Sequence, residues 1–277
     1  MNNSPHHILL ATDGSEFSDG AQRLAIHFAQ RCQAQLTAMT ILLPIADFEG
    51  VGTHNLRETL EREGQARLDA VVRAAQADKV ACATRMVYGQ TPEYEVVNVA
   101  DTLNTDLIVL GRRGKRGLAR FMVGHATAWV AGHARCLVLV VPKAAQFWQQ
   151  RILVATDGSV YGDAAVNAAS VLAMQCALPV TVVSVTTRSH GAERKAEAQA
   201  AVDRALSVYK EAGVVADGLV IEGRPDEAII ATAAERGADL IVIGSHGRTG
   251  LLQLFLGSIS ERIIGQAQCP VLVAHPG

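Results

Sequence analysis

The sequence predicts an α/β protein in which two consecutive domains each form a doubly wound, five-stranded parallel sheet with strand order 3-2-1-4-5. The first observation is an internal repeat, because residues 8–15 (ILLATDGS) recur as residues 152–159 (ILVATDGS). The second is the alternation of short Val/Ile/Leu runs with amphipathic stretches of helical spacing. Continuous apolar runs are typical of strands buried on both faces, as in parallel sheets that are covered by helices.

The repeat also predicts the domain organisation. Residues 105–111 (TDLIVLG) recur as residues 238–244 (ADLIVIG), and a Cys-containing strand at 136–140 recurs at 269–273. The chain of 277 residues is long enough for two domains, which we place at residues 1–143 and 150–277. The second copy is shorter in its middle, and we expect this to reflect a trimmed loop where the first copy has residues 43–55.

Each predicted strand is an apolar run that is flanked by turn residues or by a helical pattern. In the first copy the strands are expected at 7–12, 36–42, 82–88, 106–111 and 137–141, and in the second at 151–156, 179–186, 214–221, 239–244 and 271–275. The clearest helical patterns cover 21–32, 56–76 and 192–212.

The fifth strand of each copy would be an exposed sheet edge, and long apolar edges need a partner. We therefore expect the two fifth strands to pair antiparallel and to form an internal pseudo-dimer. A homodimer of two chains is an open alternative.

Composition narrows the function classes. The net charge of −2 offers no global field for nucleic acid, so we expect no nucleic-acid partner. Five scattered cysteines, without a C-x-x-C pair, indicate reduced thiols. No signal peptide is apparent, and no apolar run reaches the ~20 residues of a membrane span. A cytoplasmic location is the expectation.

Doubly wound sheets bind ligands at the carboxyl ends of their strands, where the winding direction reverses. For this strand order, that point lies between the first and fourth strands of each copy. Asp157 and Gly158 follow the first strand of the second copy, and a glycine-rich segment at 244–260 follows the fourth. Glycines allow the backbone to approach an anion, and a helix beginning near Gly257 would present free amides to a phosphate. Asp157 is placed to accept hydrogen bonds from a ribose hydroxyl or an adenine amine.

Each of these features has a purely structural alternative. The glycines could serve a tight turn only. Ser258 and Glu261 also match an S-x-x-E capping box, and Asp157 with Ser159 could form a turn that caps a helix beginning near Tyr161. Their convergence at one predicted crevice favours a ligand site.

The combination resembles the universal stress protein family in its tandem form, whose domains have an adenine nucleotide alpha hydrolase-like, Rossmann-like fold. The ATP-binding subset of that family carries the motif G-x2-G-x9-G-(S/T), which Gly244, Gly247, Gly257 and Ser258 match with every spacer intact. The family's opening before the aspartate is matched with a small departure at Ala155 and Thr156.

The resemblance implies a site for ATP, with ADP or AMP as alternatives. Asp157 would contact adenine and ribose, Val185 would pack on the base, and Gly244 would lie by the ribose. The phosphates, often bridged by Mg²⁺, would be held by Gly247, Gly257, Ser258 and Ser260. His246 and Arg248 flank the phosphate turn, with solvated loop side chains as the alternative. The implied set is Ala155, Thr156, Asp157, Val185, Gly244, His246, Gly247, Arg248, Gly257, Ser258, Ile259 and Ser260. No set of protein metal ligands is expected.

The first copy departs from this pattern, because His125 replaces the small hydroxyl residue at the start of the helix. An imidazole there would remove the small cap and crowd the phosphates, or it would bind an anion when protonated. We therefore predict a weaker or different second site. Its residues are Asp13, Ile41, Gly111, Gly114, Gly124, His125 and Thr127. The adjoining loop also carries basic residues for a phosphate-rich ligand or an acidic partner, with a solvated surface as the alternative. These are Arg112, Arg113, Lys115, Arg116 and Arg120.

The motifs of fast phosphoryl chemistry are missing from the sequence. There is no G-x4-G-K-(S/T) loop, no nucleophile elbow and no evident general base beside the glycine-rich segment. The leading hypothesis is an ATP-binding regulator of the stress response, with an unknown protein partner that responds to nucleotide occupancy. One alternative is a slow ATPase or autophosphorylating enzyme. The other is a nucleotide-independent scaffold whose basic loop binds an acidic partner or a phosphorylated lipid.

Overall fold

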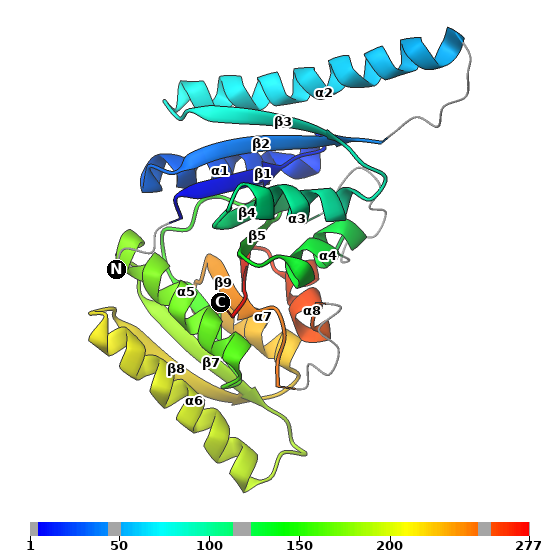
Figure 1. Cartoon of the computed structure of the whole chain (residues 1–277). Helices are drawn as coiled ribbons and strands as arrows, with labels where there is room; N and C mark the ends of the chain where they lie inside the picture. The colour runs from blue at the N-terminus through cyan, green and yellow to red at the C-terminus, as the bar shows by residue number, and fades with distance from the viewer. Residues whose placement is uncertain (1–4, 44–50, 113–122, 249–255, 277) are drawn as a thin grey trace.

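The computed structural model describes residues 5–43, 51–112, 123–248 and 256–276. Strands and helices alternate throughout both copies, as the apolar periodicity predicts (Figure 1). The first copy contains β1 (His7–Ala11), η1 (Glu16–Ser18), α1 (Asp19–Cys32), β2 (Gln35–Leu42), α2 (Val51–Ala77), β3 (Cys82–Tyr88), α3 (Pro92–Thr102), β4 (Leu107–Gly111), α4 (His125–His133) and β5 (Leu137–Val141). The second contains β6 (Ile152–Ala155), α5 (Val160–Cys176), β7 (Val180–Thr186), α6 (Ala192–Glu211), β8 (Ala216–Glu222), α7 (Pro225–Glu235), β9 (Leu240–Gly244), α8 (Ser258–Gln266) and β10 (Val271–Ala274).

All ten strands belong to one sheet, in the order β3-β2-β1-β4-β5-β10-β9-β6-β7-β8. Each half has the predicted 3-2-1-4-5 order with parallel neighbours. The halves meet where β5 and β10 pair antiparallel, with Leu139 opposite Leu272. The predicted internal pseudo-dimer is therefore confirmed, and its two sheets form one continuous sheet because each apolar edge strand satisfies the other's free backbone groups.

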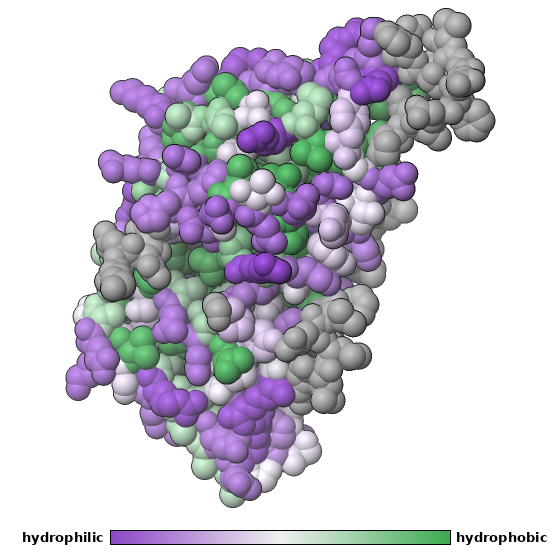
Figure 2. All heavy atoms as spheres, viewed as in Figure 1, coloured by the Kyte–Doolittle hydropathy of each residue, from purple (hydrophilic) through white to green (hydrophobic). Residues whose placement is uncertain are grey.

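Helices cover both faces of the sheet and enclose two apolar clusters. Successive strand residues alternate between these clusters, so Ile8 and Leu10 contribute to one and Leu9 to the other. The first cluster lies under α1, α2, α5 and α6, and the second under α3, α4, α7 and α8. Hydrophilic side chains dominate the outer surfaces of α2 and α6 (Figure 2).

The segment between the two copies contributes to the core. Trp148 is 2% exposed, and its ring lies 5.6 Å from Phe28 and 4.3 Å from Phe147, measured between centroids. Burial of large aromatic side chains is a major source of folding free energy. This segment therefore packs against the first copy instead of acting as a solvated linker.

Part of the difference in length between the two copies lies in a helix. Helix α2 has 27 residues and begins at Val51, whereas its counterpart α6 has 20. The expectation of a trimmed loop at 43–55 is therefore wrong for residues 51–55, because the helix continues N-terminal of Leu56, where the apolar pattern starts. In the described ranges no helix, α2 included, combines the length and apolar character that crossing a bilayer requires.

Candidate functional site

The candidate site of the second copy lies between neighbouring parallel strands that lead to opposite faces of the sheet. Strand β6 pairs with β9, and the chain continues from β6 into α5 and from β9 towards α8. The α5 helix packs on the face of α1, α2 and α6, whereas α8 packs on the other face. This divergence leaves space between the strand ends, which is where ligands bind in doubly wound folds.

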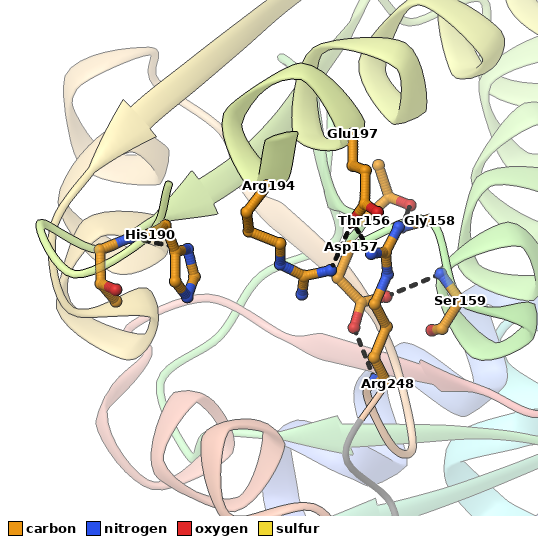
Figure 3. A network of polar contacts seen from close by, with 9 residues as sticks. Thr156, Asp157, Gly158, Ser159, His190, Arg194, Glu197 and Arg248 are labelled. Carbon is orange, nitrogen blue, oxygen red and sulfur yellow. Dashed lines mark hydrogen bonds and ion pairs between the residues drawn. The ribbon is translucent and has the colours of Figure 1, made fainter. Parts of the chain in front are cut away.

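Asp157 connects the two strand ends. Its Oδ1 accepts a hydrogen bond from the Ser159 amide at 3.0 Å, and its Oδ2 accepts one from the Arg248 amide at 2.8 Å (Figure 3). The first bond closes a local turn, while the second reaches a residue 91 positions away. A carboxylate has about four acceptor positions, so Asp157 retains capacity for ligand donors while its position is held by main-chain amides.

The turn after Asp157 depends on a glycine. Gly158 has φ of +73°, a left-handed conformation that residues with a Cβ adopt only with strain. Its amide donates to Thr156 Oγ1 at 3.1 Å, and Thr156 is itself buried. Ser159 then caps α5 by accepting from the Gly162 amide at 3.1 Å. The structural interpretation of this turn is therefore confirmed for Ser159, while Asp157 has the additional long-range contact.

The glycines of the glycine-rich segment allow close approach of the surrounding groups. A Cβ on Gly247 would lie 2.9 Å from Asp157 Oδ2, and one on Gly257 would lie 3.1 Å from the Ser245 carbonyl oxygen. A Cβ on Gly244 would lie 2.7 Å from the Tyr161 carbonyl oxygen, so this glycine lets α5 pack closely against β9. Gly247 and Gly257 thus allow the turn after β9 to approach Asp157 and Ser245 closely, while Gly244 serves the packing of α5.

Helix α8 begins beside the turn after β9. Its N-cap is Gly257, no side chain caps it, and Ser258 is its first residue. The capping-box alternative for Ser258 and Glu261 is therefore wrong, because Ser258 lies one position too far along the helix to act as the cap. The Gly257 amide donates to Ser245 O at 2.9 Å. The amides of residues 258–260 precede the first i−4 pair of the helix, Glu261 N to Gly257 O, so they have no acceptor inside α8, and such amides suit an anion.

Several other residues of the candidate set have partners within the protein. Ser260 is buried, and its hydroxyl donates to the Gly244 carbonyl at 2.9 Å, which joins α8 to the end of β9. Ile259 is 41% exposed at the start of the helix. Val185 and Ala155 are half-buried and pack against the second apolar cluster near the ends of β7 and β6. A base that packed on Val185 would thus meet an apolar surface.

His246, in the turn after β9, is a buried histidine. It is 8% exposed, with its ring 5.0 Å from that of Tyr161. The alternative of a solvated loop side chain is therefore wrong for His246, because Tyr161 covers it. Burial, together with the charge of nearby His246, lowers the pKa of His275 to about 4.

Arg248 is also held within the protein. Its guanidinium pairs with Glu197 on α6, which in addition pairs with Arg194 at 3.0 Å (Figure 3). Sequence patterns did not indicate Glu197 or Arg194 as site residues. Their i, i+3 spacing on a helical segment was the one available signal, and such pairs are common on solvated helices.

The first copy repeats this geometry with differences at its aspartate. Asp13 Oδ1 accepts from the Ser15 amide at 2.9 Å, the Ser15 hydroxyl at 2.6 Å and the Ser18 hydroxyl at 2.9 Å. Gly162 stands where the first copy has Ser18, so the second copy lacks the last of these donors. The Arg67 side chain also lies against Gly14, with its Cδ 2.6 Å from the position of a Cβ. Asp13 is therefore more fully occupied than Asp157.

His125 occupies the first position of α4 and points outward. It is 83% exposed, and its Nδ1 lies 3.3 Å from Glu93 Oε1. The helix cap is Gly124, as Gly257 is in the second copy. The expectation that His125 removes a small cap is therefore wrong, since neither copy uses this position as the cap.

The remaining residues of the first site have structural partners where they are described. Thr127 Oγ1 donates to the Gly111 carbonyl at 3.1 Å, as Ser260 does to Gly244. Ile41 is half-buried in β2. Arg112 Nη1 donates to the Ala267 carbonyl at 2.8 Å and so links the two copies. The predicted positions Gly114, Arg113, Lys115, Arg116 and Arg120 lie outside the described residues.

The described ranges contain no group of three or more His, Cys, Asp or Glu side chains arranged to hold a metal ion. The fold and the site together define a class of protein: a tandem α/β domain pair in which one geometry of aspartate, glycines and a helix amino end is repeated at the topological switch points.

Comparisons with known proteins give the family. The model of the universal stress protein family matches residues 5–142 and 149–275. A universal stress protein of Methanocaldococcus jannaschii is 35% identical over 140 residues, which cover 49% of this chain and 81% of the relative. One from Mycolicibacterium smegmatis is 27% identical over 289 residues, covering 97% of both chains. The crystal structure of a universal stress protein from Archaeoglobus fulgidus DSM 4304 has the same fold, with a TM-score of 0.77 and 21% identity over 99% of this chain and 97% of its own. The chain belongs to the universal stress protein family.

Proposed function

We propose that the second copy binds an adenine nucleotide, with ATP as the ligand and ADP or AMP as alternatives, and that the protein acts in the cytoplasm as a nucleotide-dependent regulator of the stress response. In this proposal residues 1–143 and 150–277 are the two domains. The observation that carries the proposal is the position of Asp157, whose carboxylate bridges the end of β6 and the loop after β9, while α8 begins at Ser258 without a side-chain cap.

Three kinds of group would orient the nucleotide: an acceptor carboxylate, an apolar side chain and donor amides. Asp157 would accept from the sugar or the base, and Val185 would supply an apolar contact for the base. The amides of residues 258–260, with the positive end of the α8 dipole, would stabilise phosphate oxygens. The absence of a side chain at Gly247 and Gly257 supports this placement, because a Cβ at either position would crowd the Asp157 carboxylate or the Ser245 carbonyl.

Magnesium fits this site only as a companion of the nucleotide. The described ranges have no cluster of carboxylates for it, so phosphate oxygens and water would be its ligands. When bound, Mg²⁺ would neutralise phosphate charge. The residues of this chain would contribute by orienting the phosphates through the α8 amides.

The two sites are proposed to differ in strength. Asp13 Oδ1 already accepts three hydrogen bonds, and Arg67 fills the space at Gly14. A ligand would have to displace these contacts in the first copy. We therefore expect ATP to bind mainly to the second copy.

Calorimetric titration with ATP and Mg²⁺ tests the proposal. Asp157→Ala should weaken binding by about tenfold or more, in line with loss of a charge-assisted hydrogen bond, while Asp13→Ala should change it by less than about twofold. Asp163→Ala is the matched control, because Asp163 is exposed in the first turn of α5. Equal losses for Asp13→Ala and Asp157→Ala would refute the asymmetry. Absence of ATP, ADP and AMP binding by the unaltered protein would refute the function.

A further inference from the structure

Two arginine side chains converge at the end of β6, beside the proposed sugar position. A Cβ placed on Gly158 would lie 2.9 Å from Arg204 Nη2 and 3.1 Å from Arg248 Nη2. Arg204 comes from the middle of α6, and Arg248 from the loop after β9. Two guanidinium groups from separate elements therefore reach the same point beside Gly158, on the rim of the site.

The charges at this rim are unbalanced. Glu197 on α6 pairs with the guanidinium groups of both Arg194 and Arg248 (Figure 3). Arg204 has no ion-pair partner in the part of the chain that the structure describes. The three arginines, Arg194, Arg204 and Arg248, therefore face only two carboxylates among the residues described at this rim, Glu197 and Asp157. An additional anion would relieve the repulsion between the guanidinium groups.

Among the described residues, the first copy has different neighbours beside the corresponding glycine, Gly14. In the first copy the acidic residue of the corresponding helix, Glu63, pairs with Arg67 on the same helix at 3.0 Å, and the Arg67 stem fills the space against Gly14. In the second copy the neighbour at that place is the small side chain of Ala201, whose Cβ lies 3.1 Å from the position of a Cβ on Gly158. The smaller residue leaves room beside Gly158 for the guanidinium groups of Arg204 and Arg248.

The second copy thus has two places for anions, on neighbouring strand ends. One is the start of α8 beside Gly257, where main-chain amides are available, and the other is the guanidinium pair beside Gly158. The Asp157 carboxylate joins the two strand ends. A sugar held by Asp157 could therefore carry phosphate groups towards both places.

We infer that the second copy recognises an adenosine nucleotide that carries a phosphate on its 2′ or 3′ oxygen in addition to its 5′ phosphate. Arg204 and Arg248 hold the ribose phosphate. In the absence of that phosphate Glu197 pairs with the Arg248 guanidinium, and the phosphate displaces it. This inference rests on the proposed function, since it requires the 5′ phosphate at α8 and the sugar at Asp157. Guanidinium groups suit phosphate because their planar donors match its oxygens in pairs.

Calorimetry with three ligands tests the inference: adenosine 5′-monophosphate, adenosine 3′,5′-bisphosphate and adenosine 2′,5′-bisphosphate. One bisphosphate should bind about tenfold more tightly than the monophosphate, as expected for an added charge-assisted contact. Arg204→Gln should remove that preference and leave monophosphate affinity within about twofold. Glu197→Gln should strengthen bisphosphate binding, because the competing carboxylate is gone.

Lys210→Gln is the matched control, since it removes one positive charge from an exposed position further along α6 and should keep the preference. Equal binding of all three ligands by the unaltered protein would overturn this inference and leave the proposed function intact. Binding of none of them would overturn this inference, and the proposed function would fall with it only if ATP and ADP also failed to bind. A preference that survives Arg204→Gln, or one that Lys210→Gln removes equally, would overturn the assignment to this rim.

Discussion

The bridge made by Asp157 leads to a quantitative prediction for Asp157→Asn. The carboxylate accepts one amide hydrogen bond on each oxygen, from Ser159 at 3.0 Å and from Arg248 at 2.8 Å. A carboxamide has a single acceptor oxygen, so one of the two bonds must be lost. Hydrogen bonds to charged groups contribute about 1.5–3 kcal/mol, and the lower end applies here because the Arg248 bond is exposed to solvent. We expect the loop at Arg248 to open about tenfold more often.

Amide hydrogen exchange measures this opening directly. The Ser159 bond closes a local turn, so the Asn side-chain oxygen should keep it and the Arg248 amide should lose protection by about tenfold. Asp163→Asn makes the same chemical change at an exposed position of α5 and should leave the Arg248 amide unchanged. Unaltered protection of the Arg248 amide in Asp157→Asn would refute the view that this carboxylate holds the glycine-rich segment.

Two further predictions concern stability. Gly244→Ala places a Cβ 2.7 Å from the Tyr161 carbonyl oxygen, where backbone cannot easily yield, and should lower the free energy of unfolding by about 1–3 kcal/mol in urea titrations. Gly223→Ala, whose added Cβ would make only an ordinary 3.6 Å contact, is its control, and equal effects would contradict the packing argument. For His275, whose pKa falls from 6.5 to about 4 on burial, the unfolded chain takes up the proton first as the pH decreases. The free energy of unfolding should therefore be undiminished above pH 6.5 and should drop by about 2 kcal/mol on going to pH 5, a drop that His275→Leu should remove. The same pH dependence in both proteins would show that other groups cause it.

The succession of strands and helices could be predicted from the sequence because it depends on local periodicity, whereas the strand order of each half was predicted from the doubly wound fold class. The run at residues 240–243 (LIVI) is apolar at every position, which is typical of a strand covered on both faces. The prediction that the fifth strands pair followed from the same property, since two apolar edges in one chain can satisfy each other. The start of α2 was misplaced because residues 51–55 carry no apolar pattern, although the backbone continues the helix there.

The sequence also pointed to Asp157, Gly244, Gly247 and Gly257 as one site, because a parallel sheet brings the carboxyl ends of its strands to one edge. Their individual partners could not be predicted in this way. The capping role of Gly257, the burial of His246 under Tyr161 and the outward direction of His125 each depend on how loops pass over neighbouring elements.

The sequence by itself determined that this chain is a tandem repeat of one α/β domain, which runs become strands and which strand ends meet at the predicted site, since hydrophobic periodicity and parallel topology are sufficient for these features. Only the tertiary structure decided what surrounds that site. The Arg248 amide meets Asp157 across 91 residues, and its guanidinium meets Glu197 across 51. Contacts between polar side chains so far apart leave no periodic signal in the sequence, because they arise only after the apolar strands have placed separate loops and helices beside one another.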